Sequence, residues 1–163
     1  MLWNIPIPPL KWKDTIQIIK DRITTGVYEP STAAYHSRWF WILKQDGKSL
    51  CLVHDLQPLN AVTIRDSSTP LFVEHLVEFF SGYVVYGMMD LFAGYDQWPL
   101  HPESQDLTTF NSPMGPYWLT MVPMRYTNAV QIYQADICFI LQEEIPRHTI
   151  PFIDDVAIKT LLI

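Results

Sequence analysis

Cysteine is scarce in this sequence, and no segment is apolar for long enough to suggest a membrane span. Cys51 and Cys138 lie far apart and form no CxxC pair, which argues against a disulfide framework or a cysteine-based zinc site. The five histidines show no HxxxH spacing, so zinc is not expected. No apolar run approaches the roughly 18 residues of a bilayer span, and no signal peptide is recognisable. These absences predict an intracellular protein of the cytoplasm or nucleus that is neither secreted nor bound to a membrane.

Charged residues are also few, at 17%, whereas 48% of the 163 residues are hydrophobic and 13% are aromatic. Such a chain can bury a core and is expected to form a folded domain rather than a disordered or coiled-coil segment. Thirteen prolines are many for a helical bundle and favour a mixed fold with many loops.

The charges are unevenly distributed. Residues 1–65 carry eight Lys and Arg against five Asp and Glu, whereas residues 66–163 carry three against twelve. A basic first part suits contact with phosphates and an acidic second part suits metal ions. The plain alternative is a mixed surface without functional meaning.

Local patterns predict strands and helices without regular βα alternation. We expect hairpins at residues 38–53 and 108–120 and helices over residues 14–22, 73–80 and 127–144. Residues 83–89 form a short apolar run that predicts a central strand buried on both faces. We therefore expect an α+β fold with a mainly antiparallel sheet.

The strongest chemical signal is the segment 152–156, FIDDV, in which two carboxylates lie between apolar strand segments. Two such charges about 4 Å apart repel by roughly 4 kcal/mol at an effective dielectric near 20, and a divalent cation removes that repulsion. The alternative is an acidic turn that faces water. Asp90 also ends a predicted strand. If it lies beside Asp154 and Asp155, three carboxylates meet in the pattern of a two-metal site.

These motifs occur in an order and spacing that resemble the reverse transcriptase of Ty3/gypsy-type long-terminal-repeat retrotransposons, especially fungal ones. The resemblance covers residues 1–160 and is carried by GVYEPS from 26, WFWILKQDGK from 39, VHDLQPLN from 53, MDLFAGYDQ from 89, TFN from 109, residues 123–134 and FIDD from 152.

The resemblance implies the fingers and palm of a right-hand polymerase, with an antiparallel palm sheet and packed helices. Residues 1–80 would be mostly fingers and 81–163 mostly palm, with fingers segments interleaved near 100–122. Asp90, Asp154 and Asp155 would be the catalytic, metal-holding residues for Mg²⁺ or Mn²⁺ in RNA-directed DNA synthesis.

Nucleotide contacts are implied in the same way. Lys44 matches the lysine that contacts the triphosphate, and Tyr95 the aromatic residue that stacks beneath the incoming sugar and excludes a 2′-hydroxyl. Leu91, Phe92 and Met124 fall at the other nucleotide-binding positions. The implied partners are an RNA or DNA template with primer, deoxynucleoside triphosphates, and a partner chain that supplies a thumb or RNase H domain, since both are absent from these residues.

Three positions depart from the family pattern. Cys51 replaces an arginine, which removes a bidentate charged donor worth on the order of 2–3 kcal/mol of nucleotide contact. Arg125 replaces a glycine that allows close backbone approach, and Phe152 replaces the tyrosine of the YxDD motif.

Two functions remain open from the sequence. Retention of the three aspartates favours the polymerase, whereas Cys51, Arg125 and the end of the chain after the FIDD segment favour a catalytically silent, truncated retroelement remnant that acts at most as a binding module. A metal-dependent transferase of nucleotide sugars ranks last, because it gives no reason for the LN segment at 59–60 or the YDQ segment at 95–97.

Overall fold

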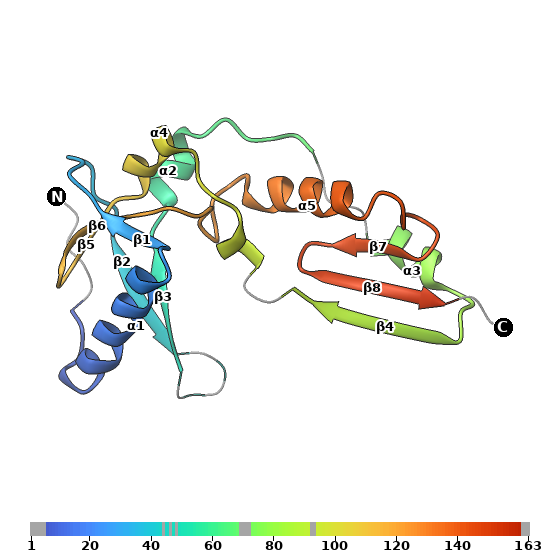
Figure 1. Cartoon of the computed structure of the whole chain (residues 1–163), viewed down its shortest axis with the longest axis horizontal. Coiled ribbons are helices and arrows are strands. Elements are labelled where there is room, and N and C mark those ends of the chain that lie inside the picture. Colours follow the sequence, from blue (N-terminus) through green and yellow to red (C-terminus); the bar gives the residue numbers. More distant parts are fainter. Residues whose placement is uncertain are drawn as a thin grey trace. The chain divides into compact units, whose positions relative to one another are not determined.

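The computed structural model describes residues 6–43, 45, 47, 49–68, 73–91 and 94–160, and Figure 1 shows its helices and strands. The chain divides into two compact units. The first unit comprises Met1–Thr63 and Trp98–Tyr126, and the second comprises Ile64–Gln97 and Thr127–Ile163. The second segment of the first unit thus interrupts the second unit.

The first unit combines short helices with two antiparallel sheets. One sheet has the order β1-β6-β5 and the other pairs β2 with β3. The elements are η1 (Pro9–Lys11), α1 (Trp12–Thr24), β1 (Tyr28–Pro30), β2 (Trp39–Leu43), β3 (Leu50–His54), α2 (Gln57–Val62), α4 (Pro102–Gln105), η3 (Asp106–Thr108), β5 (Phe110–Ser112) and β6 (Gly115–Leu119).

Aromatic side chains form the core of the first unit. Phe110, fully buried, contacts the edges of Tyr28 and Trp39, with ring centroids 5.0 and 6.5 Å away. Ile19 of α1 is fully buried in the same cluster. Each aromatic pair adds about 0.5–1.5 kcal/mol to the burial of its area, so this cluster holds α1 against the sheets.

In its described residues, the second unit has a three-stranded antiparallel sheet, in the order β4-β8-β7, together with α-helices and a 3-10 helix. Its elements are α3 (Val73–Phe80), β4 (Val85–Asp90), η2 (Gly94–Gln97), α5 (Ala129–Ile140), β7 (Thr149–Phe152) and β8 (Asp155–Thr160). Tyr133 and Ile137 of α5 and Val156 of β8 are buried. Within this unit α5 runs beside β7 (Figure 1).

Lys159 joins β8 to α3 although its side chain is a cation. The residue is only 6% exposed, and its Nζ lies 3.1 Å from the ring centroid of Phe79 and 4.3 Å from that of Tyr83. The same ammonium donates a hydrogen bond to the Phe79 carbonyl at 3.1 Å. Aromatic faces and a helix-terminal carbonyl both attract a cation, so the buried charge has partners.

The structure confirms the α+β class, and it differs from the sequence expectations in two places. The run at 83–89 was expected to be buried on both faces, but β4 is an edge strand and all six of its residues are exposed. An apolar run does not tell a central strand from an edge strand.

The helix expected over 127–144 ends at Ile140, and turns occupy 141–148. Among the residues that the structure describes, no helix has the length and apolar character of a membrane span.

Candidate active site

The acidic turn, residues 152–155, joins β7 to β8 in the second unit. Phe152 pairs with Asp155, so Ile153 and Asp154 form a two-residue turn. Ile153 has a φ of 57° and Asp154 has no positive φ, as in a type II′ turn, whose first position favours glycine. A left-handed backbone costs an L-residue about 1–2 kcal/mol. Asp154 and Asp155 therefore come directly after a strained residue.

Asp90, the last residue of β4, lies directly opposite Asp155, the first residue of β8. The Leu91 N–H also donates to the Asp154 carbonyl at 3.0 Å. Directly opposed residues of antiparallel strands share a face, with Cβ atoms about 4.5–5.5 Å apart. The sheet thus brings the three predicted aspartates to one end of the β4-β8-β7 sheet.

The chemistry of the three carboxylates, rather than their present arrangement, suits a divalent cation. Carboxylate oxygens are the ligands that Mg²⁺ and Mn²⁺ prefer. In the described part of the chain, no three His, Cys, Asp or Glu side chains are arranged to hold a metal ion. The aspartate side chains would therefore have to turn toward one another to coordinate a cation.

Two stacked tyrosines lie near these carboxylates. Tyr95, in η2, stacks on Tyr133 of α5 with centroids 4.9 Å apart and rings inclined by 29°. Gly94 makes the stack possible, because a Cβ on Gly94 would lie 2.8 and 2.9 Å from two ring carbons of Tyr133. The GY pair at 94–95 therefore sets where the Tyr95 ring lies.

The charges of the nearby aspartates affect the pKa values of both tyrosines in this stack. Burial raises the pKa of Tyr95, and the negative charge of Asp154 raises it further. Burial also raises the pKa of Tyr133, to which the charges of Asp154 and Asp90 contribute in addition. Both hydroxyls therefore stay protonated at neutral pH, and the stack adds no negative charge to the acidic turn.

Gln134 is a site residue that the sequence analysis missed. Its Oε1 accepts the Ile153 N–H at 2.7 Å, and its Nε2 donates to the Pro151 carbonyl at 2.9 Å. One side chain of α5 thus binds the backbone on both sides of Phe152. The sequence signals were that Gln134 ends the segment 123–134, one of those that carry the resemblance, and that it lies on a predicted helix.

The remaining predicted residues are spread over both units. Lys44 and Phe92 lie outside the residues that the structure describes. Leu91 is half-buried directly after Asp90. Met124 is 63% exposed and, like Cys51, belongs to the first unit. The Cys51 thiol donates weakly to the Leu52 carbonyl at 3.7 Å.

Arg125 occupies a backbone conformation suited to glycine. Its φ is 72°, which costs an L-residue about 1–2 kcal/mol. The Asn60 Nδ2 donates to its carbonyl at 2.9 Å and holds this geometry. This positive φ is one that glycine adopts without steric cost.

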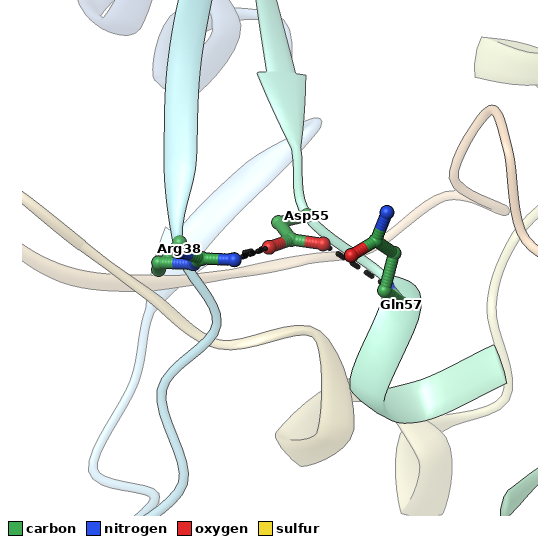
Figure 2. A network of polar contacts seen from close by, with 3 residues as sticks. All are labelled: Arg38, Asp55 and Gln57. Atoms are coloured by element: carbon green, nitrogen blue, oxygen red, sulfur yellow. Dashed lines mark hydrogen bonds and ion pairs between the residues drawn. The ribbon is translucent and has the colours of Figure 1, made fainter. Parts of the chain in front are cut away.

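The exposed Arg125 side chain lines a cavity of about 280 Å³ within the first unit, together with Arg38, His54 and Asn60. Arg38 forms an ion pair with Asp55, with Nη2 to Oδ2 at 2.6 Å (Figure 2). The other Asp55 oxygen accepts the Gln57 N–H at 3.2 Å, at the start of α2. This pair fixes the wall of the cavity between β2 and α2.

His54 lies in the cavity wall with its ring turned inward. Its Nε2 shares a hydrogen bond with the Tyr28 hydroxyl at 2.9 Å, and its ring centroid is 4.5 Å from that of Phe110. Burial, and with a smaller effect the charge of Arg22, lowers the pKa of His54 to about 4. His54 is therefore neutral at pH 7.

Comparison with known proteins found relatives among retrotransposon polyproteins, whereas no protein-family profile matches the chain. The chain is 28% identical over 152 residues to the Retrovirus-related Pol polyprotein from transposon gypsy of Drosophila melanogaster. This alignment covers 86% of this chain and 14% of that protein. It is 25% identical over 158 residues to the Transposon Tf2-3 polyprotein of Schizosaccharomyces pombe, covering 96% and 12%. The chain thus spans a small part of these relatives.

Solved structures of foamy virus protease-reverse transcriptase have the same fold. The native prototype foamy virus protein gives a TM-score of 0.84 at 26% identity, over 98% of this chain and 21% of that one. A foamy viral protease-reverse transcriptase in complex with RNA/DNA hybrid gives 0.83 at 19% identity, over 99% and 21%. The resemblance predicted from the motifs is therefore confirmed: the sequence is related to polyproteins of Ty3/gypsy-type retrotransposons, and the fold is that of a reverse-transcriptase-like domain.

Proposed function

We propose that this chain is the catalytic part of an RNA-directed DNA polymerase and that Asp90, Asp154 and Asp155 hold the divalent cations of nucleotidyl transfer. The observation that carries the proposal is the pairing of Asp90 with Asp155 across β4 and β8, next to the strained acidic turn. Opposed like charges destabilise a sheet, and such a cost at one sheet end is typical of a functional site.

In this proposal the first unit corresponds mostly to fingers and the second mostly to palm. The second unit holds all three aspartates, and the first has the basic segments. A template with its primer and a deoxynucleoside triphosphate would be the substrates, as the foamy viral complex with RNA/DNA hybrid suggests by analogy. A partner chain or a further segment would supply a thumb and RNase H.

The residues of the chain would bind and orient these substrates. When bound, two Mg²⁺ or Mn²⁺ ions supply the charge that lowers the pKa of a primer 3′-hydroxyl and stabilises the leaving pyrophosphate. Tyr95 would face the sugar of the nucleotide, where its ring would exclude a 2′-hydroxyl. Lys44 would contact the triphosphate, and Leu91, Phe92 and Met124 would line the nucleotide.

A catalytically silent binding module is the second candidate, and Arg125 is the observation that favours it. A long side chain stands where the related reverse transcriptases have glycine, on a left-handed backbone. Cys51 adds to this, because a half-buried thiol cannot replace an arginine as a clamp on a triphosphate.

Primer extension separates the two candidates. The chain is incubated with a DNA primer on an RNA template, deoxynucleoside triphosphates and Mn²⁺, beside Asp154→Asn. As a control, Asp106→Asn removes an exposed carboxylate of the first unit. The polymerase proposal predicts extension by the wild type and the control and a loss of at least about 100-fold in Asp154→Asn. Template binding without extension by any of the three proteins would favour the binding module.

A further inference from the structure

Gln134 holds the backbone of the acidic turn from outside the β7–β8 hairpin. Its carbonyl accepts the Ile153 N–H and its amide donates to the Pro151 carbonyl, at 2.7 and 2.9 Å. The Nε2 is also 3.2 Å from the Cys138 sulfur. Only one orientation of the amide satisfies both backbone groups, since an N–H must meet the carbonyl oxygen and a C=O must meet the amide nitrogen.

Gln134 binds the part of the turn whose backbone conformation favours glycine. Ile153, with φ at 57°, is β-branched, and such a residue seldom adopts this conformation unless its surroundings impose it. The hydrogen bond to its N–H is therefore made at the strained residue itself. Asp154 and Asp155 follow directly, so their direction depends on this conformation.

Gln134 is itself fixed by the packing of α5. It lies next to Tyr133, which is 1% exposed, and one turn before the buried Ile137. A side chain on a packed helix holds its partners more closely than one on a loop. The distance of 19 residues between Gln134 and Ile153 makes this a tertiary contact that local preferences of the turn do not supply.

We propose that Gln134 is a positioning residue that holds the acidic turn in the conformation in which its carboxylates bind cations. The inference rests on the proposed function, because it takes the carboxylates as the cation ligands. Groups that orient metal ligands through hydrogen bonds commonly change metal affinity by 10–100-fold when they are removed. Gln134 acts on the ligands through the Ile153 and Pro151 backbone and does not touch the cation.

The test compares Gln134→Met with Gln131→Met in the full chain. Methionine keeps the length of the side chain and suits a helix, but removes both hydrogen bonds. Gln131 lies on the same helix, and no described residue donates to its Oε1. Mn²⁺ affinity is measured by titration of the free-ion electron paramagnetic resonance signal, and thermal melting without metal checks the fold of each protein.

We expect Gln134→Met to weaken Mn²⁺ binding about tenfold or more and Gln131→Met to leave it within twofold, with similar melting of both. We also expect the Ile153 amide to exchange with solvent faster in Gln134→Met only. Adding Ile153→Gly to Gln134→Met should recover part of the affinity, because glycine adopts the positive φ without help. If Gln134→Met does not melt cooperatively, Gln134→Ala replaces it.

Equal Mn²⁺ affinity in wild type and Gln134→Met would overturn the role of Gln134 and leave the proposed function standing. A wild type that binds no Mn²⁺ would contradict the proposed function itself. A tenfold loss in both Met variants would show a general effect of α5 and would also overturn the specific role of Gln134.

Discussion

Gly94 lies against the ring of Tyr133 so closely that no side chain fits between them. A Cβ at residue 94 would stand 2.8 and 2.9 Å from two ring carbons, well inside ordinary contact. The close approach lets Tyr95, the next residue, stack on the same ring. A glycine thus fixes the aromatic surface beside the acidic turn.

Gly94→Ala should therefore destabilise the protein by about 1–3 kcal/mol, the usual cost of overpacking. For this chain length the melting temperature would fall by about 2–4 °C per kcal/mol. Gly87→Ala is the matched control, because the nearest atom to its Cβ would be Ile158 Cβ at 3.9 Å. Tyr133→Phe should relieve part of the Gly94→Ala cost, because the nearest atom to that Cβ is the Tyr133 hydroxyl oxygen. Equal melting of the two alanine variants would contradict this packing.

Arg125→Gly should stabilise the protein. Glycine removes the left-handed cost of about 1–2 kcal/mol but loses about 0.5–1 kcal/mol more backbone entropy on folding, which leaves a gain of up to about 1.5 kcal/mol. Urea unfolding measures this difference. Arg65→Gly, at an exposed loop residue, should give no gain. A loss of stability in Arg125→Gly would mean that the arginine side chain contributes more than its backbone costs.

Neutral His54 should make stability depend on pH. Because its pKa is about 4 in the folded chain against 6.5 ordinarily, the unfolded chain takes up the proton first as the pH falls. This contribution is complete above about pH 6.5 and is lost between pH 6.5 and 4, by at most about 3 kcal/mol. His54→Gln should make the urea midpoint less dependent on pH over this interval, whereas His36→Gln, at an exposed residue, should not. If the urea midpoint of His54→Gln falls with pH as steeply as that of the wild type, the burial of this ring would be refuted.

The pairing of Asp90 with Asp155 should appear as repulsion without metal. Asp90→Asn and Asp155→Asn should each raise the free energy of unfolding by about 0.2–1 kcal/mol, and the double variant should gain less than their sum. Melting in a metal-free buffer gives the three values. Gains that add fully would show that the two carboxylates do not interact, against the observed register.

Local patterns were enough to predict α3, both hairpins around residues 38–53 and 108–120, and the hairpin that carries the acidic turn. The segment at 152–156 showed its strand, acid and strand order directly. At the start of α5 the N-cap residue is Asn128, whose side chain does not cap the helix: its Oδ1 accepts the Asp66 N–H and its Nδ2 donates to the Ile64 carbonyl.

Long-range relationships were beyond the sequence patterns. The exposure of β4 depends on how many strands flank it, which its apolar run does not encode. The bonds of Gln134 to the acidic turn and the approach of Gly94 to Tyr133 join residues far apart in the chain. Such contacts follow from tertiary packing, so single-sequence periodicity cannot reveal them.

The most direct test of the central claim is a thermal melt with and without millimolar Mn²⁺ and a deoxynucleoside triphosphate, on the wild type, Asp154→Asn and Asp106→Asn. Ligand at about 100 times its dissociation constant stabilises by about 2.7 kcal/mol, a shift of roughly 5–10 °C at this size. The account predicts this shift in the wild type and in Asp106→Asn and its loss in Asp154→Asn. A cooperative melt that does not move in the wild type, or one that moves equally in Asp154→Asn, would contradict a metal and nucleotide site at the acidic turn.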